Sequence, residues 1–131
     1  MIASYRGKAV IVTGGTAGIG LATALAFARQ GASCVLTYRF GTADEDAVRA
    51  RFREVGGPEP MFFQADAARD DDTDALLAAV RERHDRVEAL IANASTSLVV
   101  RSFEDYDRRA LLKSIEASAW PMVEYTRRIK K

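Results

Sequence analysis

The chain has 131 residues, a length typical of one domain with a single hydrophobic core. Apolar residues make up 48% of the chain and charged residues 28%, a composition that counts against disorder. The 19 basic residues are nearly balanced by 18 acidic ones, which counts against a polyanion-binding surface. No apolar run approaches the roughly 20 residues of a membrane helix, and the first residues, "MIASYRGK", lack the apolar region of a secretory signal. We therefore expect one domain over residues 1–131 in a cytoplasmic protein without membrane or nucleic-acid partners.

Strand and helix patterns alternate along the chain. Apolar, β-branched runs indicate buried strands, and apolar residues three or four positions apart indicate helices. The predicted strands are 8–14, 33–40, 60–66 and 86–95. The predicted helices are 18–30, 42–57, 69–84 and a long segment from residue 103 onward. Pro121 is expected to kink or divide this last helix, because a proline inside a helix removes a hydrogen bond and clashes with the preceding turn.

Four strand and helix repeats of this kind predict an α/β fold with a parallel sheet and right-handed crossovers. The strands are nearly continuous apolar runs, as expected when helices cover both faces of a sheet. The sequence thus predicts a Rossmann-like doubly wound parallel sheet in a three-layer α/β/α arrangement.

The stretch "VTGGTAGIG", residues 12–20, places four glycines between the first strand and the first helix. In a doubly wound sheet this turn is where a pyrophosphate meets the unpaired amides of a helix N-terminus. We expect Gly14 to leave the strand in a conformation that a Cβ disfavours and Gly18 to let the backbone approach phosphate closely. Gly20 would let the new helix pack against the sheet. The alternative is a turn that is rich in glycine for its geometry alone.

The end of the second strand bears on which dinucleotide is bound. NAD sites place an acid there for the ribose 2′-hydroxyl, whereas NADP sites omit the acid and provide a base for the 2′-phosphate. The chain has Thr37-Tyr38-Arg39-Phe40 at this position, with no carboxylate before Asp44. Arg39 can make a charge-assisted, bidentate contact to phosphate, so NADP(H) is favoured over NAD(H). The alternative is that Arg39 is a solvated surface base.

Three segments in this order carry a family resemblance. "TGGTAGIG" resembles the nucleotide-binding signature of the short-chain dehydrogenases/reductases, "QAD" at 64–66 falls where that family has an acid after its third strand, and "LIANAS" at 90–95 is similar to its Asn-Asn-Ala-Gly segment. The resemblance implies a pyrophosphate site lined by Thr16, Ala17, Gly18 and Ile19. It further implies that Asp66 and Ala67 meet the adenine, while Asn93 and Ala94 flank the adenine-side ribose and steady the central strand.

The chain departs from this family at several positions. Ala17 stands where the family often has a base, which places more of the 2′-phosphate recognition on Arg39. Ala92 and Ser95 replace the usual asparagine and glycine of the fourth-strand motif, and Ser95 adds a side chain beside the expected nicotinamide ribose. In the long helix, Ser114 or Glu116 lies near the position of the family's catalytic asparagine.

The family's catalytic Tyr-x-x-x-Lys pair does not occur in the chain. By the resemblance, that pair and the substrate loop belong to a later part of such enzymes, so we expect the fold to be truncated after the fourth strand and its following helix. We name no catalytic and no metal-binding residue. The resemblance implies an NADP(H)-dependent oxidoreductase that acts on a carbonyl or alcohol and forms a homo-oligomer, a dimer or tetramer. The alternatives are an enoyl-type double-bond reductase and a non-catalytic dinucleotide-binding module.

The remaining chemistry-bearing residues have structural interpretations. Cys34 lies in an apolar strand and is expected to be a buried, unreactive thiol. The acids at 70–72 and the base His84 fit the two ends of a helix dipole better than a metal site. Met61, Phe62 and Phe63 are expected to lie in the core, and Trp120 with Tyr125 either in the core or against a partner subunit.

Overall fold

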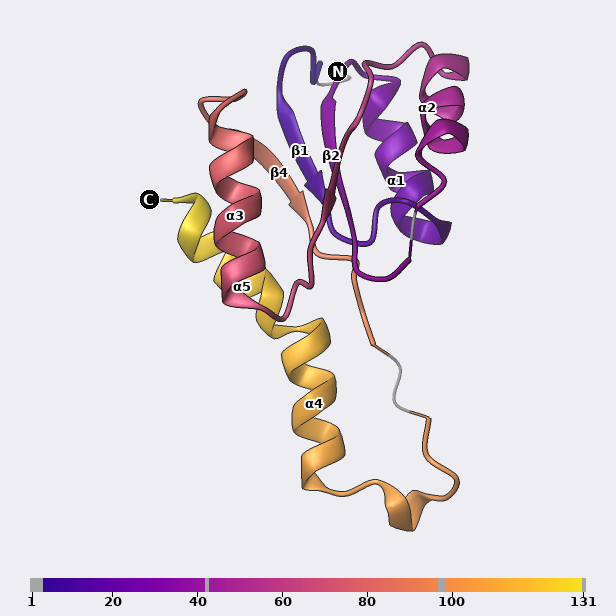
Figure 1. Ribbon diagram of the computed structural model, residues 1–131, viewed down its shortest axis with the longest axis vertical. Coiled ribbons are helices and arrows are strands. Elements are labelled where there is room, and N and C mark those ends of the chain that lie inside the picture. The colour runs from indigo at the N-terminus through magenta and orange to yellow at the C-terminus, as the bar shows by residue number, and fades with distance from the viewer. Residues whose placement is uncertain (1–3, 42, 97–98, 131) are drawn as a thin grey trace.

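The computed structural model describes residues 4–41, 43–96 and 99–130. Strands and helices alternate in chain order from β1 to β4, and three helical segments follow (Figure 1). The strands are β1 (Ala9–Val12), β2 (Ser33–Tyr38), β3 (Met61–Gln64) and β4 (Val87–Ile91). The helices are α1 (Gly18–Ala28), α2 (Glu45–Glu54), α3 (Asp70–Arg81), the 3-10 helix η1 (Phe103–Asp105), α4 (Arg108–Ser118) and α5 (Trp120–Ile129).

Each predicted strand and helix is present, and most are shorter than predicted. The start predicted for α2 at Thr42 lies outside the described residues. The helix begins at Glu45, and the Asp44 carboxylate caps it by accepting a hydrogen bond from the Ala47 amide at 3.0 Å. The predicted helix from Phe103 onward begins as the short η1 instead, because Asp107 caps a new helix by accepting from the Ala110 amide at 2.8 Å.

The four strands form one sheet in the order β3-β2-β1-β4, and every neighbouring pair is parallel. The chain moves from β1 outward to β3 and then crosses to the other side of β1, where β4 pairs. The strand order therefore reverses next to β1, and ligands of such sheets bind beyond the carboxyl ends of the strands at this point. The predicted doubly wound parallel sheet is confirmed.

Helices cover both faces of the sheet, α1 and α2 on one side and α3 and α5 on the other (Figure 1). Alternate residues of β1 divide the core between the two faces. Val10 and Val12 pack against α1 and α2, where Phe52 closes the cluster, whereas Ile11 packs with side chains of α3 and with Tyr125 of α5. Side chains on both faces of a central strand are buried, as a three-layer sandwich requires.

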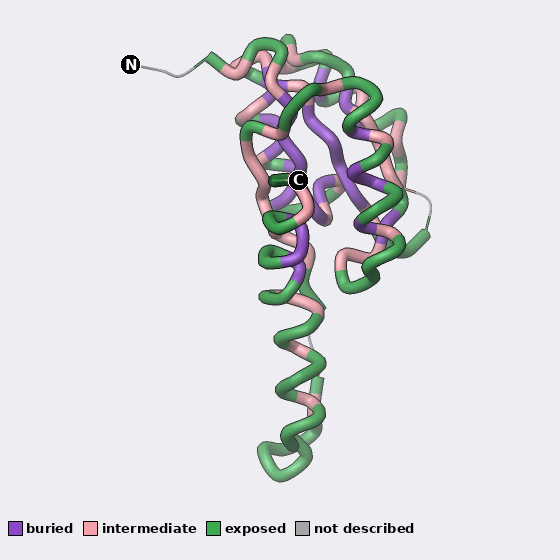
Figure 2. Tube along the Cα trace, turned by 90° about the vertical axis from the view of Figure 1, so that its left-hand side faces the viewer, coloured by how far each residue is buried: buried purple, intermediate pink, exposed green. Residues whose placement is uncertain are grey.

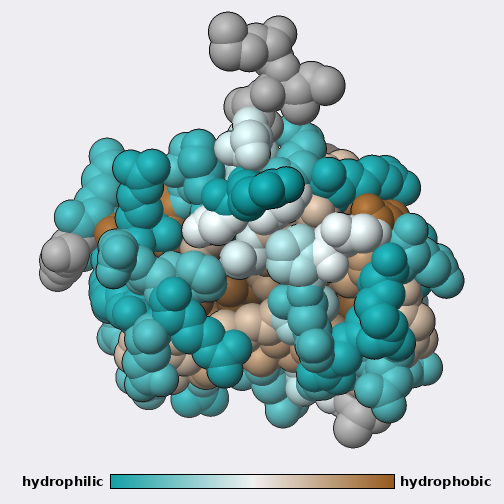
Figure 3. Space-filling model, turned by 90° about the horizontal axis from the view of Figure 1, so that it is seen from above, coloured by the Kyte–Doolittle hydropathy of each residue, from teal (hydrophilic) through white to brown (hydrophobic). Residues whose placement is uncertain are grey.

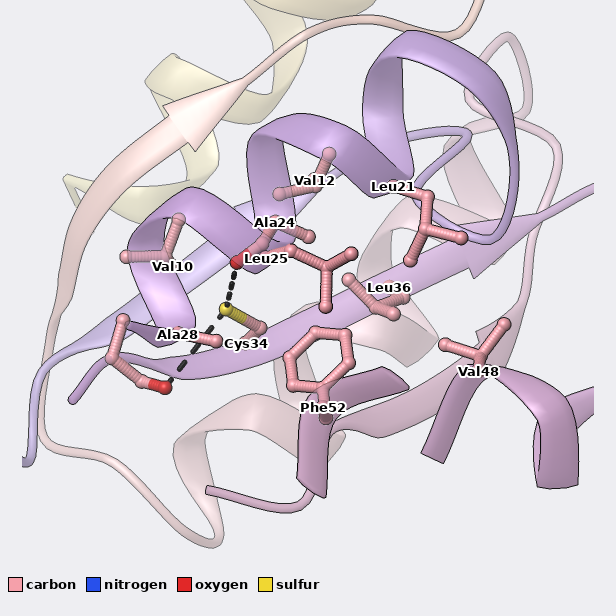
Figure 4. Close-up of a cluster of buried hydrophobic side chains, with 11 residues drawn as sticks. Val10, Val12, Leu21, Ala24, Leu25, Ala28, Cys34, Leu36, Val48 and Phe52 are labelled. Atoms are coloured by element: carbon pink, nitrogen blue, oxygen red, sulfur yellow. Dashed lines mark hydrogen bonds between the residues drawn. The ribbon is translucent and has the colours of Figure 1, made fainter. Parts of the chain in front are cut away.

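Cys34 lies inside the first of these clusters and is 1% exposed (Figure 4). Its Sγ is 3.5 Å from the carbonyl oxygen of Ala24 and 3.9 Å from that of Ala32. Burial raises the pKa of the Cys34 thiol from 9.0 to about 12, so the side chain stays a neutral thiol at physiological pH. Its environment is that of a structural cysteine, as expected.

Strand β3 lies at an edge of the sheet, so its side chains are less buried than predicted. Met61, Phe62 and Phe63 are partly buried and pack on the core clusters from outside. An edge strand has a neighbour on one side alone, and that position reduces the cover over its side chains. The prediction of core positions for this strand was therefore too strong.

Pro121 divides the last helix, as predicted. It lies in the first turn of α5, where the missing amide hydrogen costs nothing, and Ala119 separates α5 from α4. Helix α4 extends away from the body of the molecule and carries mostly exposed residues (Figures 1 and 2). Tyr125 of α5 is fully buried, whereas Trp120 is 46% exposed.

At the opposite end of the molecule from α4, hydrophilic side chains surround a smaller group of hydrophobic ones (Figure 3). None of the helices in the described part of the chain combines the length and the apolar character that crossing a bilayer requires.

Candidate functional site

The turn between β1 and α1 is held against the end of β2. The Gly14 amide donates to the Thr37 hydroxyl at 3.3 Å, and the Gly15 amide donates to the Thr37 carbonyl oxygen at 3.0 Å. Thr37 is 1% exposed. Its buried hydroxyl and carbonyl groups therefore need hydrogen-bond partners, and the two glycine amides provide them. The glycine-rich segment is thus fixed at the carboxyl ends of the two strands.

Two glycines of this turn meet different requirements. Gly18 has φ +53° and open space where a side chain would stand, so its backbone is free to be approached from outside. At Gly20, an added Cβ would collide with the carbonyl oxygen of Gly14 and lie 2.7 Å from Nδ2 of Asn93. Gly20 therefore lets α1 pack closely against the turn itself, which is a nearer neighbour than the sheet.

Helix α1 begins without the usual capping groups. Ala17 is the N-cap and provides no side-chain hydrogen bond, and the first turn holds no acid. The first amides of a helix lack intrahelical partners and carry the positive end of the helix dipole. Ala17, Gly18 and Ile19 are exposed here, Ile19 at 80%. This end of α1 has the electrostatics and the access of an anion site.

Asn93 links this turn to the end of β4. Its Nδ2 donates to the carbonyl oxygens of Thr13 at 3.0 Å and of Gly14 at 3.2 Å. In return, the Thr13 hydroxyl accepts from the amides of Asn93 at 3.0 Å and of Ala94 at 2.9 Å. These bonds join the carboxyl ends of β1 and β4, where the strand order reverses. Thr13, the first residue of the glycine-rich motif, thus fixes the turn through hydrogen bonds that the sequence did not predict.

Arg39 and Asp66 form an ion pair at the ends of β2 and β3. Nε of Arg39 lies 2.9 Å from Oδ2 of Asp66, with the arginine side chain 45% exposed and the aspartate 17%. The Asp66 amide donates to Oδ2 of Asp72 at 2.8 Å, which anchors the aspartate to the first turn of α3. The sequence predicted separate partners for these two side chains, and the structure brings them into contact.

A cleft of about 350 Å³ opens at these strand ends. Six of the eleven predicted site residues line it: Gly14, Arg39, Asp66, Ala67, Asn93 and Ala94. Thr16, Ala17, Gly18 and Ile19 do not line the cleft itself but belong to the turn that begins at Gly14, and Gly20 is buried beneath that turn. The cleft and the exposed end of α1 are linked by the turn that starts at Gly14, and together they are the candidate site for an elongated ligand.

The end of α4 also reaches this cleft. Ala117 lines it, whereas Ser114 and Glu116 do not, and the Ser114 hydroxyl donates to the Ala110 carbonyl oxygen of its own helix at 3.1 Å. Ser95 lines the cleft, and its hydroxyl oxygen is 3.3 Å from that of Ser118. This contact, which the sequence did not predict, ties the end of β4 to the end of α4.

A doubly wound parallel sheet with a glycine-rich first turn and a cleft at the switch point defines the dinucleotide-binding class of α/β folds. Within this class, the chain is similar to one family of known proteins. A family model described as short chain dehydrogenase matches residues 8–131. The chain belongs to the short-chain dehydrogenase family.

Several relatives agree with this assignment. The 3-oxoacyl-[acyl-carrier-protein] reductase of Synechocystis is 35% identical over 76% of the chain and 41% of that protein. The chloroplastic NADPH-dependent aldehyde reductase 1 of Arabidopsis thaliana is 31% identical over 81% of the chain and 38% of that protein. Among solved structures, the NADH-dependent reductase A1-R′ complexed with NAD is 30% identical, with a TM-score of 0.83 over 95% of the chain and 52% of its own. The chain thus spans less than half the length of the two named relatives and about half of the solved reductase.

Proposed function

We propose that the chain is the cofactor-binding part of an NADP(H)-dependent oxidoreductase of the short-chain dehydrogenase/reductase type, which transfers hydride to or from a carbonyl or alcohol substrate. The observation that carries the proposal is the uncapped N-terminus of α1, exposed at Gly18 beside a cleft that Arg39 and Asp66 line. Such a helix end favours the binding of a pyrophosphate, and the adjoining cleft would hold the nucleoside attached to it.

The residues present fit a dinucleotide. The amides at the start of α1, from Thr16 to Ile19, would hold the pyrophosphate, and Asp66 with Ala67 would meet the adenine. Asn93 and Ala94 would flank the adenine-side ribose. A bound nicotinamide dinucleotide would supply or accept the hydride, and the described residues bind and orient it.

Arg39 supports NADP(H) over NAD(H). It lines the cleft, its side chain is partly exposed, and its planar guanidinium can donate two parallel hydrogen bonds to a phosphate. Relatives of both kinds exist, one named as NADPH-dependent and one solved with NAD. The family relatives therefore leave the cofactor open, and the proposal of NADP(H) for this chain rests on Arg39.

The proposal extends to the complete protein: a cytoplasmic homo-oligomer, a dimer or tetramer, acting on a small molecule. The exposed apolar side chains of α4 and α5 support association. Among them are Leu111 at 46%, Leu112 at 50%, Ile115 at 44% and Met122 at 55% exposed. Exposed apolar patches of this kind mark interaction surfaces.

The substitution Arg39→Asp tests the cofactor assignment. Titration calorimetry should show the affinity for NADP⁺ falling by about tenfold or more, because a charge-assisted contact is replaced by repulsion. The affinity for NAD⁺ should hold or rise, since a carboxylate can accept from the ribose 2′-hydroxyl. Arg53→Asp makes the same charge change on an exposed part of α2 and should alter neither affinity. Equal binding of both dinucleotides before and after Arg39→Asp would refute the phosphate role.

A further inference from the structure

Phe40 follows Arg39 at the end of β2, and its ring packs against the arginine. The guanidinium carbon of Arg39 lies 4.5 Å from the centroid of the Phe40 ring. This distance is within the range of a favourable cation–π contact, which needs the cation within about 6 Å of the ring centroid. Phe40 also lines the cleft beside Arg39.

The Phe40 ring has no large role in the core, since it is 77% exposed and belongs to neither buried cluster. A substitution at Phe40 can therefore leave the fold intact while it changes the surroundings of Arg39.

Two further contacts restrict Arg39. The ion pair with Asp66 holds the guanidinium through Nε, and the Gln64 side-chain amide donates to the Arg39 carbonyl oxygen at 3.3 Å. With its backbone, its Nε and one face of its plane engaged, the arginine loses less conformational freedom when a ligand binds. Its terminal nitrogens carry the donors that a phosphate uses bidentately.

We propose that Phe40 is a specificity-determining positioning residue: its ring holds the Arg39 guanidinium at the cleft, ready for the 2′-phosphate of the dinucleotide. The inference rests on the proposed NADP(H) function and extends it to a residue outside the glycine and asparagine motifs. The ring acts through Arg39, so its loss should weaken the binding of ligands that carry the 2′-phosphate and spare those that lack it.

The test compares Phe40→Leu, which keeps an apolar side chain without a ring, and Phe40→Trp, which keeps an aromatic face. Each variant of the full chain is titrated with NADP⁺, NAD⁺, 2′,5′-ADP and 5′-AMP. Phe40→Leu should weaken NADP⁺ and 2′,5′-ADP by about 2- to 5-fold, the equivalent of one exposed cation–π contact, and leave NAD⁺ and 5′-AMP unchanged. Phe40→Trp should retain the parent affinities. Phe103→Leu, at an 86% exposed ring outside the cleft lining, is the matched control and should change none of them.

The other outcomes are distinguishable. An equal loss of all four ligands in Phe40→Leu would show that the ring contacts the shared adenosine, and no loss at all would show that Arg39 needs no such support; either overturns the inference. If Arg39→Ala removes the preference for 2′-phosphate while Phe40→Leu does not, the proposed function stands and the inference alone fails. If the parent chain does not distinguish 2′,5′-ADP from 5′-AMP, both fail.

Discussion

The side-chain amide of Asn93 donates to the carbonyl oxygen of Thr13 at 3.0 Å, across 80 residues of sequence. The same amide donates to the Gly14 carbonyl oxygen at 3.2 Å. Both acceptors belong to the turn that leads into α1, so one side chain supports the backbone on which the proposed pyrophosphate site depends. The strand ends and the candidate site are thus coupled through Asn93.

Asn93→Asp should therefore be strongly destabilising despite its nearly identical shape. A carboxylate has no hydrogen to donate, and it would face two carbonyl oxygens that are then left without this partner. The expected loss is about 1–3 kcal/mol in the free energy of unfolding, measured by urea denaturation at pH 7. Dinucleotide affinity should fall as well, because the turn loses its support.

Gln30→Glu is a matched control for this change. The Gln30 amide also donates to a backbone carbonyl oxygen, that of Ala26 at 3.4 Å, but on an exposed helix end. The same amide-to-carboxylate replacement should cost little there, because water can take the place of the lost bond. A stability loss as large in Gln30→Glu as in Asn93→Asp would remove any special role from Asn93.

Gly18 provides a separate test of the anion site. It has φ +53°, and apart from its own chain neighbours and the adjacent helix backbone no atom lies within 4 Å of the place that a Cβ would occupy, so Gly18→Val strains the backbone without meeting another part of the protein. The added side chain would project into the space through which a phosphate approaches the amides of α1. We expect dinucleotide binding to be abolished in a titration while the circular dichroism spectrum stays helical.

Gly56→Val separates the two effects. Gly56 has φ +69° with equally open surroundings, but it follows α2 and does not line the cleft. Its substitution should lower the thermal midpoint about as much as Gly18→Val and leave dinucleotide binding intact. Unchanged binding in Gly18→Val would remove the phosphate role from this turn.

The sequence predicted the fold more completely than the site. Alternating apolar runs and helical spacing located the four strands and the α-helices of the described chain but not the break between η1 and α4, since the core pattern follows directly from which residues are apolar. The glycines located the first turn, because a positive φ at Gly18 and the tight contact at Gly20 leave little choice of residue. The positive φ of Gly18 and the contact of Gly20 with the Gly14 carbonyl oxygen are local properties that neighbouring residues in the sequence decide.

The contacts that shape the cleft are not local, and here the sequence was a poorer guide. The pairing of Arg39 with Asp66 depends on two strands ending side by side, and the contact of Ser95 with Ser118 depends on where α4 crosses the end of β4. The partial exposure of Phe62 follows from the edge position of β3, which strand order decides and apolar character does not. The pattern of residue types along a single sequence does not show which distant residues come into contact in the fold.

Cys34 leads to a prediction about the pH dependence of stability. Burial raises the pKa of its thiol to about 12 in the folded protein, whereas an exposed thiol ionises near 9.0. Below pH 9 the thiol is protonated in both states, and stability does not depend on it. Above pH 9 the unfolded chain releases the proton while the folded chain keeps it, so stability falls as the pH rises, until the folded thiol also ionises near pH 12.

The expected size of this effect is about 1.4 kcal/mol between pH 8 and pH 10, the free energy of one pKa unit. It is measured as the difference between the parent chain and Cys34→Ala in urea denaturation at both values, because tyrosines and lysines titrate equally in the two proteins. The parent should lose more stability than Cys34→Ala over this interval. Parallel losses would mean that the folded thiol ionises as readily as the unfolded one. The buried position of Cys34 between α1 and the sheet separately predicts slow alkylation that accelerates when urea unfolds the chain.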